Sequence, residues 1–90
     1  MATPVIVECD ADVWTKVATN VTTGFIKKLK GSPVKMLETY RMTGDAAPDD
    51  DSEGAALFED SDTMEIDSPL AGIDVYVYSI GGNGRVRRDV

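Results

Sequence analysis

The chain ends in Ile73-Asp-Val-Tyr-Val-Tyr-Ser-Ile-Gly-Gly-Asn-Gly-Arg-Val-Arg-Arg-Asp-Val90, and this stretch decides the fold class. β-Branched and aromatic residues alternate with other residues on both sides of Gly81-Gly-Asn-Gly84, which is the pattern of two strands joined by a turn. Asn83-Gly84 is a dipeptide that readily adopts the positive φ angles of a tight primed turn. The sequence therefore predicts a C-terminal β-hairpin in an all-β protein.

Similar runs recur along the rest of the chain, and turn residues separate them. They predict strands over 4–9, 13–17, 25–29, 34–42, 55–59 and 63–66. Residues 34–42 are compatible with a helix in isolation, but Thr39 and Tyr40 and the breakers before them favour a strand. Together these runs predict one domain over residues 1–90, a small antiparallel β-sandwich or barrel of about seven short strands.

The charge of the chain is unevenly distributed. Its net charge is -7, and residues 42–84 contain eleven acidic residues and no basic residue. Such an acidic protein lacks the cations that neutralise phosphates, so we expect no direct binding to nucleic acid. The polar, acidic stretch 44–54 cannot supply a core, and we expect it to be a projecting loop.

The N-terminus and the cysteine content indicate the compartment. Met1-Ala-Thr-Pro4 does not begin a secretory signal, and no apolar run is long enough to span a bilayer. We therefore expect a soluble protein made in the cytoplasm, without a membrane partner. With one cysteine and no histidine, a zinc site is excluded, and Cys9 is expected to be a small core residue.

Clustered acidic residues give a weak calcium motif. Asp49, Asp51 and Glu53 alternate before Gly54, and Asp60 stands where the twelfth ligand of a calcium loop would lie. The flanking segments do not have helical patterns, and the last ligand would be the shorter aspartate. We favour a solvated charged loop, and we expect no cofactor and no resident metal.

Nothing in the sequence predicts an enzyme. There is no Gly-x-Ser-x-Gly motif and no histidine to serve as a base, and the acidic residues lie in a polar loop rather than in an apolar pocket. We therefore expect a binding or assembly module.

The candidate interface residues are aromatic and basic. They are Trp14, Tyr76, Tyr78, Arg85 and Arg87. Tyr76 and Tyr78 make both faces of their strand apolar, which predicts that another subunit or a loop covers one of them. Arg85 and Arg87 share a strand face and either meet an acidic partner or protect a strand edge from aggregation.

Several segments resemble a known group of proteins. They are Val13-Trp-Thr-Lys-Val-Ala-Thr-Asn-Val-Thr-Thr-Gly24, Tyr40-Arg-Met-Thr-Gly-Asp-Ala-Ala-Pro48, Ser52-Glu-Gly54, Asp74-Val-Tyr-Val-Tyr78 and Arg85–Val90. These segments resemble small accessory virion proteins of tailed bacteriophages. The resemblance implies a capsid decoration (cement) protein that stabilises the head from its outer surface. Such proteins bind the major capsid protein in many copies and often form homotrimers, and the resemblance assigns no functional residue.

Two alternatives remain open at this point. One is a tail or fibre-anchoring adaptor protein, which a virion would contain in few copies. The other is a calcium- or carbohydrate-binding β-sandwich module. Because a domain of 90 residues has a small core, association with neighbours is expected in each case.

Overall fold

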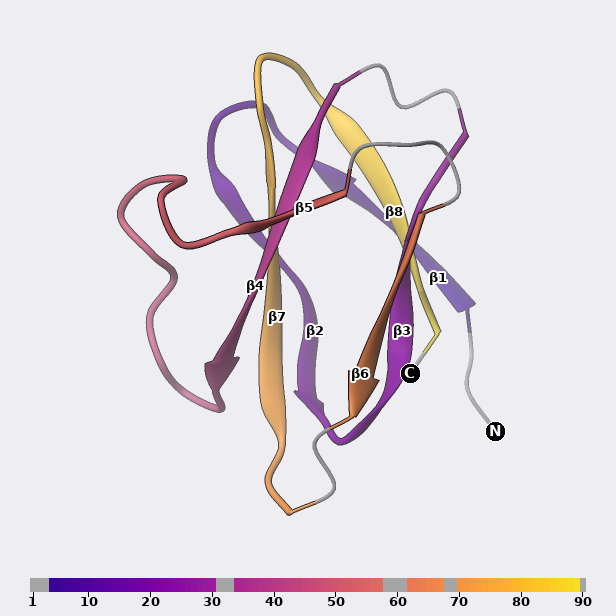
Figure 1. Cartoon of the computed structure of the whole chain (residues 1–90), viewed down its shortest axis with the longest axis vertical. Helices are drawn as coiled ribbons and strands as arrows, with labels where there is room; N and C mark the ends of the chain where they lie inside the picture. The colour runs from indigo at the N-terminus through magenta and orange to yellow at the C-terminus, as the bar shows by residue number, and fades with distance from the viewer. Residues whose placement is uncertain (1–3, 31–33, 58–61, 68–69, 90) are drawn as a thin grey trace.

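The strands form where β-branched and aromatic residues alternate with polar ones. A computed structural model of the chain describes residues 4–30, 34–57, 62–67 and 70–89. Among these residues there are eight strands (Figure 1), namely β1 (Pro4–Cys9), β2 (Trp14–Val21), β3 (Thr23–Lys28), β4 (Met36–Met42), β5 (Ala55–Leu57), β6 (Thr63–Asp67), β7 (Ile73–Ser79) and β8 (Gly84–Asp89). The predicted all-β fold is confirmed, and residues 34–42 contain a strand rather than a helix.

The strands form two four-stranded antiparallel sheets. Sheet A has the order β1-β8-β3-β6, and sheet B has the order β2-β7-β4-β5. Four pairs of strands are neighbours, namely β1 with β8, β2 with β7, β3 with β6, and β4 with β5. The first half of the chain therefore pairs with the second half in reverse order, as the two arms of one long hairpin do. This pairing is the jelly-roll topology of two Greek keys. The predicted sandwich is therefore confirmed, and its connectivity is now defined.

The core lies between the inner faces of the two sheets. Its fully buried members come from both sheets: Cys9, Val17, Ala18, Val21, Ile26, Met36, Ile66, Val75, Val77 and Val86. Val17 and Ala18 are consecutive and both buried, because the register between β2 and β7 shifts between Lys16 and Ala18. A β-bulge of this kind allows two neighbouring residues to face the same side.

The predicted C-terminal hairpin is wrong. Both of its strands exist, but β7 pairs with β2 and β4 in sheet B, whereas β8 pairs with β1 and β3 in sheet A. Residues 80–83 therefore cross from one sheet to the other. Positive φ occurs at Gly81, at 83°, and not at Asn83 or Gly84, so no primed turn forms.

Asn83 has a different role from the predicted one. Its side-chain oxygen accepts a hydrogen bond from the backbone N–H of Ala11 at 2.9 Å. In the same region the backbone N–H of Gly81 donates to the Asp12 carboxylate at 3.0 Å, and the N–H of Asp12 donates to the carbonyl of Ser79 at 2.8 Å. These bonds tie the β7–β8 connection to the β1–β2 connection at one end of the sandwich.

Cys9 is a core residue, as predicted, and its burial has a measurable consequence. Its side chain is 1% exposed. Burial raises the pKa of the thiol from 9.0 to about 11, and the neighbouring charges of Glu8 and Asp10 add to this effect. The thiolate, which is the reactive form, is therefore about 100-fold scarcer in the folded state at pH 8.

We predict that iodoacetamide at pH 8 alkylates native Cys9 at least about 100-fold more slowly than the unfolded chain. Mass spectrometry of time points, with and without guanidinium, measures both rates. Rapid labelling of a chain whose circular dichroism is unchanged would contradict the buried position.

Candidate functional site

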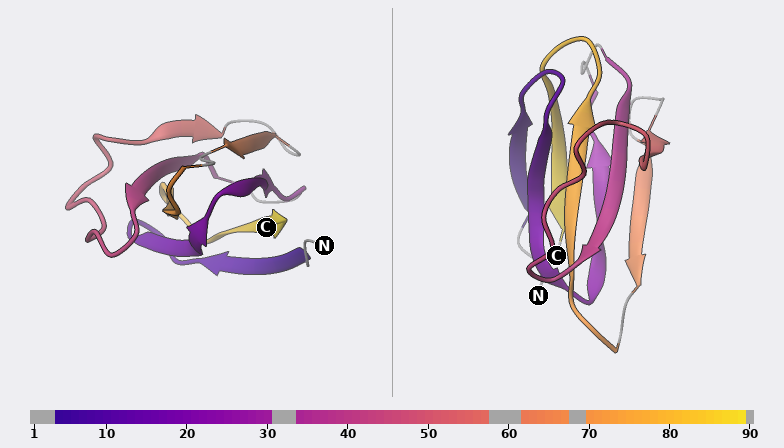
Figure 2. Two further views of the ribbon diagram at one scale, coloured as in Figure 1. Left: turned by 90° about the horizontal axis from the view of Figure 1, so that it is seen from below. Right: turned by 90° about the vertical axis from the view of Figure 1, so that its left-hand side faces the viewer.

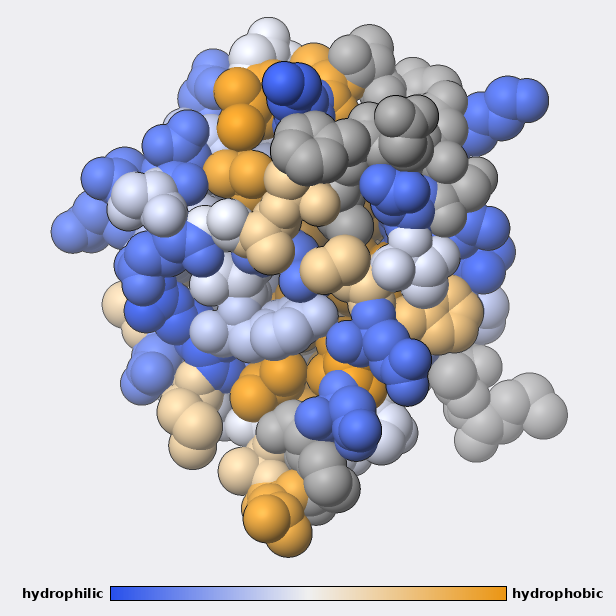
Figure 3. Space-filling model, viewed as in Figure 1, coloured by the Kyte–Doolittle hydropathy of each residue, from blue (hydrophilic) through white to orange (hydrophobic). Residues whose placement is uncertain are grey.

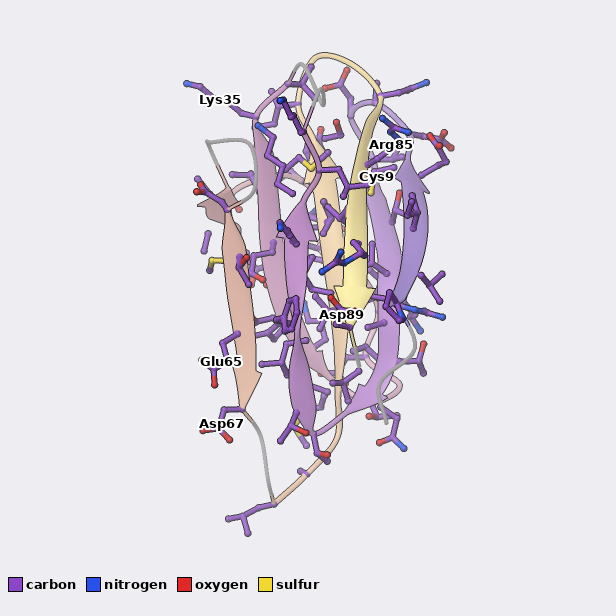
Figure 4. All side chains as sticks on the ribbon, turned by 90° about the vertical axis from the view of Figure 1, so that its right-hand side faces the viewer. Cys9, Lys35, Glu65, Asp67, Arg85 and Asp89 are labelled. Atoms are coloured by element: carbon purple, nitrogen blue, oxygen red, sulfur yellow. The ribbon has the colours of Figure 1, made fainter. Side chains whose placement is uncertain are left out.

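The sandwich has two outer faces, and they differ in what covers them. We call the outer face of sheet B the capped face, because residues 43–54 cross it. Figure 2 (right) shows this segment passing in front of β2, β7 and β4. We call the outer face of sheet A the open face, because no described segment crosses it (Figure 4). The two faces lie on opposite sides of the molecule.

The capped face carries three of the six aromatic residues of the chain, Trp14, Tyr76 and Tyr78. Trp14 and Tyr78 are opposite each other in the register of β2 and β7, and their rings meet edge to face with centroids 5.4 Å apart. Tyr76 lies on the same face and is only 6% exposed. An edge-to-face pair adds about 0.5–1.5 kcal/mol to the area that it buries.

The acidic loop is fixed to the capped face through its backbone. The Trp14 indole N–H donates to the carbonyl of Asp50 at 2.7 Å, and the Tyr76 hydroxyl donates to the carbonyl of Asp45 at 3.2 Å. Arg41 and Glu53 form an ion pair at 2.6 Å. Gly54 lies so close to β4 that a Cβ atom there would be 2.5 Å from the Cβ of Leu37.

The prediction that residues 44–54 project from the domain therefore needs correction. The carboxylates point to solvent, and Figure 3 shows hydrophilic side chains along the margin where this loop lies. The backbone, however, lies on the aromatic residues. The amphipathic Trp14 and Tyr76 explain this arrangement, because their rings need cover while their N–H and O–H groups need acceptors.

Asp74 connects the capped face to two loops. It is 1% exposed, and its carboxylate accepts hydrogen bonds from the backbone N–H groups of Asn20, at 3.0 Å, and Gly44, at 3.2 Å. Lys16 forms an ion pair with it at 3.4 Å and lies 5.5 Å from the centre of the Tyr76 ring. The bond from Asn20 is the largest of the effects that lower the pKa of Asp74. This carboxylate is therefore a structural anchor for both loops.

The open face combines apolar and basic side chains in rows defined by the strand register. In one row Ile6, Arg87 and Lys27 lie side by side on β1, β8 and β3. In the next row, Asp89 pairs with Phe25. Arg85 shares the face of Arg87, as the sequence predicted, because the two residues are separated by one position on β8.

Acidic residues lie at the margins of the open face. Glu8 is opposite Arg85 on β1, while Glu65 and Asp67 lie on β6 at the other side (Figure 4). Arg87 and Asp89 form an ion pair at 3.0 Å, and Asp89 is buried. Outside that pair, the face presents Lys27 on β3 and Arg85 near the start of β8 as exposed or half-buried cations.

One carboxylate is buried inside the sandwich. Glu38 is 3% exposed on the inner side of β4, and its Oε2 atom has no hydrogen-bond partner. Burial raises the pKa of Glu38, and a hydrogen bond with Tyr40 acts in the opposite direction. The Tyr40 hydroxyl has a second acceptor within reach, the carbonyl of Glu65 on β6 at 3.4 Å. The charged form of Glu38 is therefore less favourable than in water, because an under-paired charge is costly in the interior.

The candidate calcium ligands are not brought together. Among the residues that the structure describes, no group of three or more acidic or cysteine side chains is able to hold a metal ion. Glu53 is paired with Arg41, and the Asp50 carboxylate, which lies between Asp49 and Asp51, accepts the N–H of Ser52 at 2.9 Å. Asp60 lies outside the described residues.

The predicted interface residues fall on both faces. Trp14, Tyr76 and Tyr78 lie on the capped face beneath the chain's own loop, whereas Arg85 and Arg87 lie on the open face. The open face also contains Ile6, Phe25 and Lys27, which were not predicted as interface residues from the sequence. Alternation assigned each residue to one side of its strand, but the order β1-β8-β3 that makes them neighbours has no local signal.

Comparison with protein-family models, with curated proteins and with solved structures gives no significant match. Within the described part of the chain, no helix has the length and apolar character needed to cross a membrane.

We predict that Gly54→Ala loosens the acidic loop, because the new Cβ atom would overlap with Leu37. Overpacking of this kind costs about 1–3 kcal/mol. The fluorescence of Trp14, the only tryptophan, should shift to longer wavelength, and proteases should cleave residues 43–53 faster. Asp51→Ala, in the same loop, is the control and should leave both measurements unchanged. Equal behaviour of the two variants would argue against a docked loop.

We also predict that Glu38→Gln raises stability at pH 7 by about 1 kcal/mol, because the neutral amide removes a buried charge. The raised pKa of Glu38 means that the folded state binds this proton more tightly than the unfolded state. The wild type therefore loses stability relative to the variant as the pH rises from 4.5 through the folded-state pKa of Glu38.

Urea unfolding of both proteins between pH 4 and pH 7 measures this difference. Glu65→Gln removes an exposed carboxylate from β6, in the other sheet, and should show no such pH-dependent gain. A difference between Glu38→Gln and wild type that is the same at every pH would contradict the raised pKa of Glu38.

Proposed function

We propose that this domain is a bacteriophage virion structural protein, and specifically a capsid decoration (cement) protein. In this function it binds the major capsid protein on the outer surface of the head and reinforces the shell against internal pressure. It acts by adding interface area and has no catalytic role.

The observation that carries this proposal is the difference between the two outer faces. The capped face is closed by its own acidic loop, while the open face presents Ile6, Phe25, Lys27 and Arg85. A face that combines apolar and cationic side chains with acidic ones at its margins is suited to docking on a protein surface. The jelly roll is a recurrent fold of viral capsid domains, which adds support by analogy alone.

Docking through the open face would give the domain a defined orientation on the shell. With the open face against the shell, the acidic loop on the opposite side of the sandwich points outward. The outward carboxylates would keep neighbouring particles apart by charge repulsion. The resemblance of the segments quoted above to small virion proteins supports the same assignment.

The test is cryo-electron microscopy of particles of the encoding phage, assembled with and without this chain. We expect repeated density over the head, with β8 and β3 facing the shell and residues 43–54 facing solvent. A head without such density would refute the proposal. A few copies at the tail attachment site would instead identify a tail or fibre-anchoring adaptor.

A binding assay isolates the docking face. We predict that Lys27→Glu combined with Arg85→Glu lowers the affinity for heads that lack the chain at least ten-fold, a scale typical of reversing charges at an interface. Lys35→Glu is the control. Lys35 immediately precedes β4, which belongs to sheet B, so this variant should bind as wild type does. Unchanged binding of the double variant would exclude the open face as the contact.

A further inference from the structure

A sandwich of two open sheets has four edge strands, and three of these are protected. In sheet B, β2 is bent by two register shifts, and β5 has only three residues. In sheet A, β6 presents Thr63, Glu65 and Asp67 on its outer side. Bulges, short strands and charged side chains are the usual means of preventing pairing at an edge.

The fourth edge, β1, has no register shift, and Pro4 and Glu8 near its two ends are the residues of this strand that would protect it. Its six residues pair regularly with β8 on one side, and no described strand lies on the other side (Figure 4). Every second residue of such a strand directs its backbone N–H and C=O groups away from its only partner. Val5 is 37% exposed and Ile6 is 57% exposed, so this edge has exposed apolar side chains on both of its faces.

The charge around β1 also differs from that of the whole molecule. The chain has a net charge of -7, but strands β1 and β8 together contain Arg85, Arg87 and Arg88 against Glu8 and Asp89. Two copies that meet at this edge therefore avoid the repulsion that their acidic regions would cause. Charge therefore opposes a second copy of this chain less at this edge than at the acidic surfaces of the molecule.

We propose that two copies of this chain pair through β1 in antiparallel orientation about a two-fold axis, so that sheet A continues across the dimer. The side-chain alternation of β1 permits Ile6 to lie opposite Ile6 of the second copy, with each Glu8 opposite the other copy's Pro4. This register places the two Glu8 residues about 13 Å apart, beyond the screening length of about 10 Å at 0.1 M salt.

The alternative register, centred on Val7, is less favourable. It places each Glu8 opposite Ile6 and brings the two Glu8 residues to about 7 Å. The register centred on Ile6 keeps both open faces on the same side of the dimer. This pairing does not depend on the proposed function. A two-fold contact predicts a dimer, whereas the resemblance implies a trimer.

The experiment compares two substitutions at equally exposed apolar positions. Ile6, at 57% exposure, lies on the β1 edge, and Met42, at 58% exposure, lies at the end of β4. We expect the mass measured by light scattering to rise from monomer to dimer with concentration for wild type and Met42→Lys. Ile6→Lys should weaken this association at least ten-fold, because a lysine on an edge disfavours strand pairing. Thermal unfolding verifies that both variants are folded.

Cysteine cross-linking tests the register. Ile6→Cys should form a disulfide-linked dimer under mild oxidation, whereas Glu8→Cys should not, and the buried Cys9 should not interfere. Equal association of the Ile6→Lys and Met42→Lys variants, a trimeric mass, or a wild type that stays monomeric at high concentration would each overturn the proposal. Cross-linking of Glu8→Cys in place of Ile6→Cys would overturn the register.

Discussion

The rest of the structure depends on the burial of β7 on both of its faces. On the inner side Val75 and Val77 are fully buried in the core, and on the outer side Asp74 and Tyr76 are buried beneath loops. A single sandwich provides a second sheet for only one face of a strand. The chain covers the other face with residues 43–54, which explains why a long acidic segment follows β4 and returns to its edge as β5.

Local pattern was enough to predict the strands but not their partners. Alternation of Val75 and Val77 with Tyr76 and Tyr78 identified β7, and Val86 between arginines identified β8. Both strands place valines on the core side, so they fit a hairpin and a crossing between sheets equally well. The difference arises from Asn83 and Asp12, whose side chains fix the crossing through bonds to residues about seventy positions away in sequence.

The candidate site was predictable in composition and not in arrangement. The sequence indicated that one face of β7 must be covered, and it gave another subunit or a loop as the cover. The structure shows the loop, because the Trp14 and Tyr76 donors find carbonyl acceptors in Asp50 and Asp45. The apparent calcium pattern of this loop depended on spacing alone, and Arg41 instead engages one of its carboxylates.

The jelly-roll topology turns a separation of charge along the sequence into a separation in space. Basic residues are concentrated before residue 42 and after residue 84, and the stretch between them has only acidic ones. Because β3 lies beside β8 in sheet A, Lys27 from the first basic part of the chain meets Arg85 and Arg87 from the last part. The acidic middle forms the loop over sheet B and the edge strand β6. The connectivity therefore accounts for both the cations of the open face and the low repulsion at the β1 edge.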